Sequence, residues 1–202
     1  MVDNANTTEN QIFEAALKVF QKKGLAGARM QEIADEAGIN KSMLHYYFRS
    51  KELLFSQVFL QSFKRFTGSV LSLLNDTNAW EEKIPLIIEH YGKVMQNHPD
   101  LAMFVINELR QNTEGFVDIF KKNAFRETIF IRQLHDAMQK GEIRQVQPAQ
   151  IWISVISSII FPYIAQPMIA VTLDLQGANW DGFMADRKKM AAEMIINYLK
   201  VY

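Results

Sequence analysis

The chain has 202 residues, of which 49% are apolar and 22% are charged, as is usual for a folded globular protein. Its 22 basic and 22 acidic residues cancel, which argues against a protein that coats nucleic acid or membranes non-specifically but leaves site-specific DNA binding open. The chain has no cysteine, which excludes disulfides and thiolate metal sites; this and a polar N-terminus without a signal pattern predict a cytoplasmic location.

Apolar residues recur at intervals of three and four from the N-terminus onward, which predicts amphipathic helices. We expect the first four over residues 8–23, 30–37, 41–48 and 50–74. Gly24 and Gly38 end the first two of these helices, and Asn40 can cap the third.

Later helices are expected over residues 80–97, 100–112, 115–140, 148–173 and 182–201, separated by polar or Gly- and Pro-containing segments. No stretch alternates apolar and polar residues as a strand does. The predicted fold is therefore all-α. We expect two domains, an N-terminal three-helix domain over residues 1–52 and a C-terminal helical domain over 53–202, with the fourth helix able to belong to both.

The segment between Arg144 and Asp174 carries no formal charge, and runs of this length are candidate membrane spans. Pro162 and Pro167 interrupt it, and no flanking cluster of Lys and Arg sets an orientation. A helix buried on both sides, as at a dimer interface, is the preferred interpretation, and no membrane contact is expected.

The stretch Met30 to Lys51 carries the main functional signal. Two short helices joined through Gly38 cannot bury themselves alone, so we expect them to pack on the first helix. The third helix then has Leu44, Tyr47 and Phe48 inward, and its outward side chains are Lys41, Ser42, His45 and Tyr46. In a DNA major groove such side chains could reach base edges or phosphates. The alternative is a generic three-helix subdomain with a polar surface.

These residues resemble the TetR family of bacterial regulators. The resemblance covers roughly residues 8–60, including AALKVFQKKG and then IADEAGINKSMLHYYFRSKELLF. It implies a helix-turn-helix that binds double-stranded DNA, at a palindromic operator. The DNA-binding positions expected from the resemblance and the neighbouring residues are Arg29, Gln31, Asn40, Lys41, Ser42, Met43, His45, Tyr46, Tyr47 and Lys51.

Three features depart from the family pattern. His45 lies where Tyr is usual, and Tyr47 lies where His is common. Ala28 and Arg29 stand where a Thr or Ser usually grips phosphate before the second helix. Arg29 either replaces that neutral contact with a charged one or is simply solvated.

The resemblance also implies that the C-terminal domain dimerises and holds an effector pocket. Met and aromatic residues, which suit adaptable apolar pockets, recur there at helical spacing. The expected pocket residues are Tyr91, Met95, Met103, Phe104, Phe120, Phe125 and Trp152. The alternative for each is plain core packing. Glu108 and Arg110 are either polar anchors for a ligand or solvated surface residues.

Helices 148–173 and 182–201 are the expected dimer interface, since two such helices from each subunit would form a four-helix bundle at a two-fold axis. The interface residues expected there are Trp152, Val155, Ile159, Tyr163, Met190, Met194 and Tyr198. A dimer of this kind would read two half-sites about one helical turn apart.

Enzymatic function is not indicated. The histidines at 45, 90, 98 and 135 lack metal-ligand spacing, and there is no phosphate loop or nucleophile elbow. No cofactor and no metal are expected. The sequence thus predicts a homodimeric repressor released from its operator by a small, largely apolar effector. The alternatives are a DNA-binding dimer without an effector, and a helical enzyme or membrane-associated protein.

Overall fold

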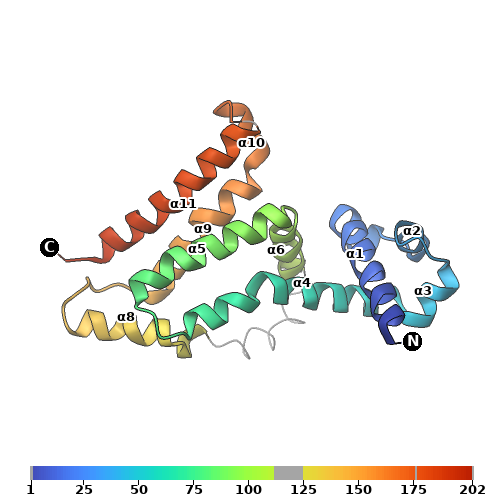
Figure 1. Cartoon of the computed structure of the whole chain (residues 1–202), viewed down its shortest axis with the longest axis horizontal. Helices are drawn as coiled ribbons and strands as arrows, with labels where there is room; N and C mark the ends of the chain where they lie inside the picture. Colours follow the sequence, from blue (N-terminus) through green and yellow to red (C-terminus); the bar gives the residue numbers. More distant parts are fainter. Residues whose placement is uncertain (1, 112–124, 176, 202) are drawn as a thin grey trace. The chain divides into compact units, whose positions relative to one another are not determined.

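The computed structural model describes residues 2–111, 125–175 and 177–201, and these residues are helical apart from turns, loops and an isolated bridge between Ile143 and Lys200. The prediction of an all-helical fold is confirmed (Figure 1). The chain forms two compact units, residues 1–64 and residues 65–202. The division falls inside one long helix, and the functional boundary proposed at residue 52 stays a prediction.

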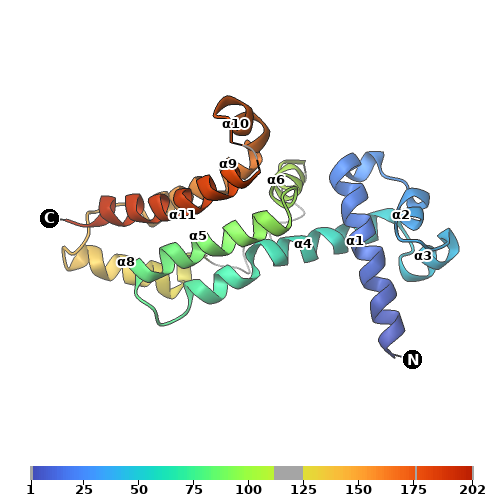
Figure 2. The ribbon, with the colours of Figure 1, turned by 45° about the horizontal axis from the view of Figure 1, so that its top comes forward.

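Unit 1 contains α1 (Val2–Gly27), α2 (Met30–Glu36), α3 (Lys41–Tyr47) and the first half of α4 (Lys51–Leu74). Both α2 and α3 lie on the same side of α1 (Figure 2). The first helix begins earlier than predicted, and its backbone leaves helical geometry at Gly24, whose φ is 64°. The buried stripe of α1 includes Phe20, whose ring meets that of Phe55 edge-on at 4.8 Å.

Unit 2 contains the second half of α4 followed by α5 (Trp80–Asn97), α6 (Leu101–Gln111), a 3₁₀ turn (Phe125–Glu127), α8 (Ile129–Gln139), α9 (Pro148–Ile164), α10 (Gln166–Thr172) and α11 (Ala178–Leu199). The helices α5, α9 and α11 pack against one another and form the interior of this unit. These three helices carry the fully buried side chains of Ile84, Ile87, Val155, Ile159 and Met184.

Two predicted helices are interrupted. Residues 112–124 lie outside the described residues, and they include the start of the helix expected over 115–140. The later part of that helix begins as the 3₁₀ turn, and α8 starts only after Thr128. The helix expected over 148–173 is α9 followed by α10, bent by 72° at Ala165. Pro167 lies in the first turn of α10, where a missing N–H costs nothing. The last helix starts at Ala178, before the start predicted at residue 182.

Pro162 lies within α9 without ending it. A proline cannot donate the helical hydrogen bond to the carbonyl four residues earlier, which here belongs to Ser158. Arg187 of α11 takes over that acceptor, with its Nε donating to the Ser158 carbonyl at 3.1 Å. A side chain of α11 thus satisfies the acceptor that this proline leaves unpaired.

Among the described residues no single helix is long and apolar enough to cross a membrane, while the bent pair α9 and α10 passes that test by length and composition only.

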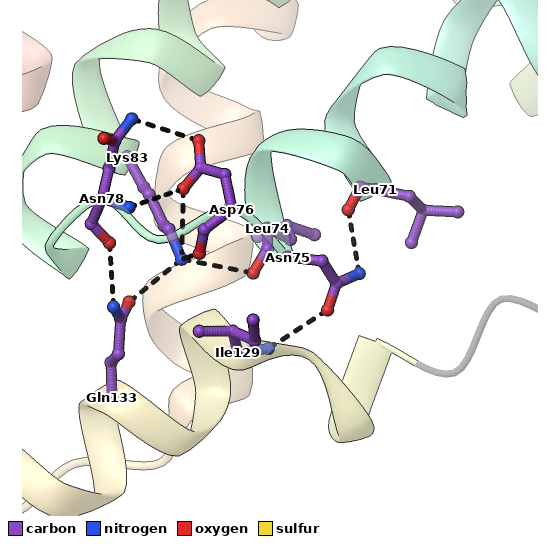
Figure 3. A network of polar contacts seen from close by, with 8 residues as sticks. All are labelled: Leu71, Leu74, Asn75, Asp76, Asn78, Lys83, Ile129 and Gln133. Carbon is purple, nitrogen blue, oxygen red and sulfur yellow. Dashed lines mark hydrogen bonds and ion pairs between the residues drawn. The ribbon is translucent and has the colours of Figure 1, made fainter.

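A buried lysine joins three elements at one end of unit 2 (Figure 3). Lys83 of α5 is fully buried, and its Nζ donates to the carbonyl of Asp76 at 2.9 Å, to the Gln133 side chain at 3.1 Å and to the carbonyl of Leu74 at 3.4 Å. The Asp76 carboxylate lies 3.4 Å from the same ammonium. A buried charge is tolerated when it is paired and hydrogen-bonded, as this one is.

The same network holds the start of α8. Asn75 accepts from the backbone N–H of Ile129 at 3.2 Å, which replaces the cap that Thr128 does not supply. Gln133 donates to the carbonyl of Asn78 at 2.8 Å. The end of α4, the loop after it and the first turns of α5 and α8 are therefore fixed to one another (Figure 3).

Candidate nucleic-acid interface

The turn between α2 and α3 is set by Gly38. Its φ is 66°, a left-handed conformation that glycine adopts without strain. The N–H of Gly38 bonds the carbonyl of Asp35 at 3.1 Å, and the N–H of Ile39 bonds that of Ala34 at 3.0 Å. This pair of bonds is the Schellman motif, which ends α2 sharply and turns the chain into α3.

Asn40 begins α3. Its backbone is extended, and its side-chain oxygen accepts from the N–H of Met43 at 2.7 Å, so the predicted cap is confirmed. The next helix starts in the same way, with the Ser50 hydroxyl accepting from the N–H of Leu53 at 3.2 Å. Both short connections therefore end in side-chain caps.

Removing the cap of α3 is expected to destabilise unit 1. Asn40→Ala loses the acceptor for the Met43 N–H, and the free energy of unfolding should fall by about 1 kcal/mol, the usual value of an N-cap. Asn40→Asp keeps an oxygen in place and should stay within about 0.5 kcal/mol of the original chain. Urea unfolding followed by circular dichroism measures both; equal losses in the two variants would contradict the capping role.

One face of α3 is buried and the other is exposed. Leu44 is fully buried and Phe48 is 6% exposed, so these two side chains hold the helix to the rest of unit 1. Lys41, Ser42 and His45 are exposed on the other side. The sequence predicted this division.

Aromatic and apolar side chains extend the exposed face of α3. Tyr46 is 84% exposed and its ring meets that of the half-buried Tyr47 edge-on at 5.5 Å. Met43 is 36% exposed beside them. The exposed face therefore combines a cation and hydrogen-bonding groups with a large aromatic surface that the unit leaves uncovered.

Arg29 precedes α2 without capping it. Its backbone is extended, it makes no side-chain cap, and its side chain is exposed, so it can meet either a phosphate or solvent. Gln31 is also exposed, but its amide donates to Asp35 at 2.8 Å. The carboxylate of Glu32 bonds Lys23 at 2.9 Å, and this hydrogen bond lowers the pKa of Glu32.

Lys51 differs from the other expected DNA contacts because it has a structural partner. Its Nζ donates to the carbonyl of Ala28 at 3.1 Å, which ties the start of α4 to the connection between α1 and α2. An ammonium has three donors, so a phosphate contact remains available. The sequence did not indicate this bond, because its acceptor is a backbone group.

Several residues expected in an effector pocket form an aromatic cluster in unit 2. The centroid of the Trp152 ring lies 4.6 Å from the centroid of the Phe125 ring and 6.5 Å from that of the Tyr91 ring. Phe66 of α4, which the predicted pocket lacked, lies 5.3 Å from Tyr91. Burial raises the pKa of Tyr91.

The other expected pocket residues are dispersed. Met95 and Phe104 are buried, whereas Met103 is 39% exposed on α6. Phe120 lies outside the described residues. Glu108 is half-buried, and burial raises its pKa, while Arg110 is exposed.

The residues expected at a dimer interface divide into two groups. Val155, Ile159 and Tyr163 are core residues, because α9 directs them against α5 and α11 within the unit. Met190, Met194 and Tyr198 of α11 are 47%, 59% and 58% exposed and remain available to a partner, and Trp152 is half-buried. A groove of about 530 Å³ lies between α9 and α11, with Met194 and Tyr198 on its wall.

Comparison with known proteins agrees with this site. Residues 12–58 match the family described as bacterial regulatory proteins, tetR family. The transcriptional repressor NicS of Pseudomonas putida is 32% identical over 108 residues, and the match spans 52% of this chain and about half (49%) of that repressor. The repressor SCO4008 of Streptomyces coelicolor is 24% identical over 93% of this chain and 95% of its own length. A TetR family transcription regulator from Marinobacter aquaeolei has the same fold over 100% of both chains, with a TM-score of 0.70 and 14% identity.

An outward-facing helix that is capped at its start and follows a Schellman turn is the second helix of a helix-turn-helix, a class of DNA-binding unit. Unit 1 therefore carries the helix-turn-helix of the TetR family of bacterial regulatory proteins. The described residues hold no group of three or more His, Asp or Glu side chains placed to bind a metal ion.

Proposed function

We propose that the protein is a dimeric cytoplasmic repressor that binds a palindromic operator and leaves it when a small, largely apolar effector binds unit 2. The observation that carries the DNA-binding part is the exposed face of α3, held from behind by Leu44 and Phe48. Two relatives named as repressors, NicS and SCO4008, support the direction of regulation.

On DNA, Lys41, Ser42, Met43, His45 and Tyr46 are the side chains that α3 presents to a major groove. Ser42 and His45 can exchange hydrogen bonds with base edges, and Met43 can contact a thymine methyl group. We expect Lys41, Lys51 and the two tyrosines to contact the DNA backbone, and such contacts position the protein without reading sequence. Asn40 acts mainly through its cap.

Selection of bound sequences from random DNA tests this proposal. We expect a palindrome whose half-sites are separated by about one helical turn, 10–10.5 base pairs, or a multiple of it. Recovery of no common sequence, or of a single half-site without symmetry, would refute the palindromic operator.

The exposed side chains of α9 and α11 support a dimer. The groove between these helices is lined by apolar residues such as Ile151, Met194 and Ile195 together with polar Ser154 and Ser158. A second copy placed on it would bury the apolar side chains that α11 leaves in water, and apolar burial is the main driving force of association. We propose the face of α9 and α11 as the two-fold interface.

Charge placed in this groove is expected to separate the subunits. Met194→Glu introduces a carboxylate that the dimer would have to desolvate, and we expect at least a hundredfold weaker self-association. Met168→Glu is the matched control, since Met168 is equally exposed (61% against 59%) but lies on α10, outside the groove. Sedimentation velocity over a concentration series measures both; an unchanged dimer in Met194→Glu would place the interface elsewhere.

The effector part of the proposal is supported by the aromatic cluster of Phe66, Tyr91, Phe125 and Trp152. Tilted and edge-on rings suit flat or apolar ligands, and Phe66 belongs to the helix that continues into unit 1. A ligand that releases DNA must bind the DNA-free conformation more tightly than the bound one. Thermal-shift screening of apolar compounds, followed by operator release with each hit, tests this; a library without any stabilising compound supports a dimer without an effector.

A further inference from the structure

The exposed face of α3 carries the one histidine of unit 1, His45. Lys41 and Ser42 precede it by four and three residues, and helical residues at these spacings are neighbours on one side of the helix. His45 makes no hydrogen bond or ion pair in the part of the chain that the structure describes. Its ring is therefore available to a base edge in the major groove.

Binding to DNA favours a positive charge on the ring of His45. The ring lies in the last turn of α3, where helix carbonyls without partners attract a cation. In the free protein Lys41, Arg49 and Lys51 oppose that charge, together with the exposed Arg29 before α2. DNA phosphates add a strong negative potential that offsets these cations. Charging of the ring is therefore coupled to DNA binding.

The carboxylates around α3 do not hold this charge in the free protein. Glu32 and Glu36 of α2, the helix that packs against α3, are paired with lysines of α1 at 2.9 and 3.1 Å. Asp35 accepts a hydrogen bond from an amide of its own helix at 2.8 Å. Glu52, in the first turn of α4, is exposed and forms no ion pair with His45 within the described residues.

A charged imidazole selects among the bases because it has two N–H donors and no acceptor. In the major groove guanine offers two acceptors, N7 and O6, and no donor. Adenine and cytosine each present an amino donor there, and thymine offers a single acceptor. A neutral imidazole has one donor and one acceptor, so it does not favour guanine in this way.

We propose that His45 binds a guanine of the operator as a charged ring, so that operator affinity and the preference for guanine both increase as the pH falls. This inference rests on the proposed operator binding and adds to it the base that is read and the regulation by pH.

The sign and size of the effect follow from proton uptake. Binding that takes up protons becomes stronger as the pH falls, and one pKa unit of extra stabilisation of a charged group corresponds to a factor of about ten. A dimer has two such rings, so we expect at least about tenfold tighter operator binding at about pH 6 than at about pH 8. His90 acts in the opposite direction, because burial lowers its pKa and acid therefore destabilises the folded unit 2.

The test selects bound duplexes from a random-sequence pool with the full chain, separately at about pH 6 and at about pH 8, the two sides of the ordinary histidine pKa. Fluorescence anisotropy then gives the affinity for the selected duplex across this range at constant ionic strength. We expect one guanine position in each half-site that is enriched more strongly at the lower pH.

Three substitutions separate charge from hydrogen bonding. His45→Gln keeps a neutral side chain that hydrogen-bonds, and it should lose the guanine preference and vary less than about twofold with pH. His45→Arg is always charged and can bind both acceptors of guanine, so it should keep the preference at both pH values. His135→Gln, at an exposed position of α8 in unit 2, is the matched control and should behave as the original chain.

The outcomes distinguish this inference from the proposed function. Enrichment of an operator whose affinity does not change with pH, or an equal pH effect in the original chain and His45→Gln, would overturn the role of His45 and leave operator binding intact. Failure to enrich any sequence at either pH would overturn both.

Discussion

Replacing Lys41 by alanine is expected to weaken operator binding by about tenfold or more and to flatten its dependence on salt. Each phosphate contact releases counterions, and its loss reduces the slope of log affinity against log salt by about 0.9. A dimer carries the change twice, so the slope should fall by about 1.8. Lys41 is exposed on α3, so folding should not change. Fluorescence anisotropy with the selected operator, repeated across a salt series, measures both quantities.

Lys22→Ala is the control for Lys41→Ala. Lys22 is an exposed residue of α1 in the same unit and is not among the proposed DNA contacts. Lys22→Ala therefore removes the same charge as Lys41→Ala but keeps the proposed contacts with DNA. It should change the slope by much less. An operator affinity and slope unaltered in Lys41→Ala would contradict the assignment of α3 as the recognition helix.

Lys51→Ala should also weaken binding, but its interpretation differs. The Nζ of Lys51 donates to the carbonyl of Ala28, so its removal leaves an unpaired acceptor that is partly buried. We expect a loss of about 1 kcal/mol in the stability of unit 1 as well as a loss of affinity. Lys41 is therefore the cleaner probe of DNA contact.

The sequence predicted unit 1 closely because its signals are local. The glycine at 38, the asparagine at 40 and the serine at 50 each fix a helix end through their own backbone or side chain. Leu44 and Phe48, spaced four residues apart, identify the buried side of α3 and thereby its exposed side.

Unit 2 was predicted less well because its signals are tertiary. The segment 148–173 is apolar on all sides, and such a helix gives no indication of which side meets its own subunit. Val155 and Ile159 were therefore predicted at the dimer interface, although both are buried within unit 2. The helix ends at Ala165, shortly before Pro167. From the sequence alone, this proline could equally have kinked one continuous helix instead of separating two.

The largest omission concerns Lys83. A lone lysine between Glu82 and Ile84 is usually a solvated residue, and no pattern in the sequence indicates that its side chain is fully buried. Its acceptors are two backbone carbonyls, a carboxylate seven residues away and an amide 50 residues away. Only the folded structure brings these groups together.

Lys83→Met is expected to be the most destabilising single substitution proposed for this chain. The substitution keeps the length and apolar stem of the side chain but removes the ammonium. This removes the donor shared by the Asp76 carboxylate, the Gln133 amide and two backbone carbonyls (Figure 3). Breaking one side of a buried charge network costs about 3–5 kcal/mol, and because Asp76 is 30% exposed we expect a loss of about 2–4 kcal/mol.

The matched control for Lys83→Met is Lys93→Met, the same change on the same helix. Lys93 is 68% exposed and has only the 3.7 Å ion pair with Glu89, so its loss should cost less than about 0.5 kcal/mol. Urea unfolding in a phosphate-free buffer compares the two. Because the network joins the end of α4 to α5 and α8, the Lys83 variant should also lose amide-exchange protection around residues 74–83 and 129–133 before the rest of unit 2. Equal stability of the two variants would show that solvent replaces the ammonium and that the network does not hold these helices together.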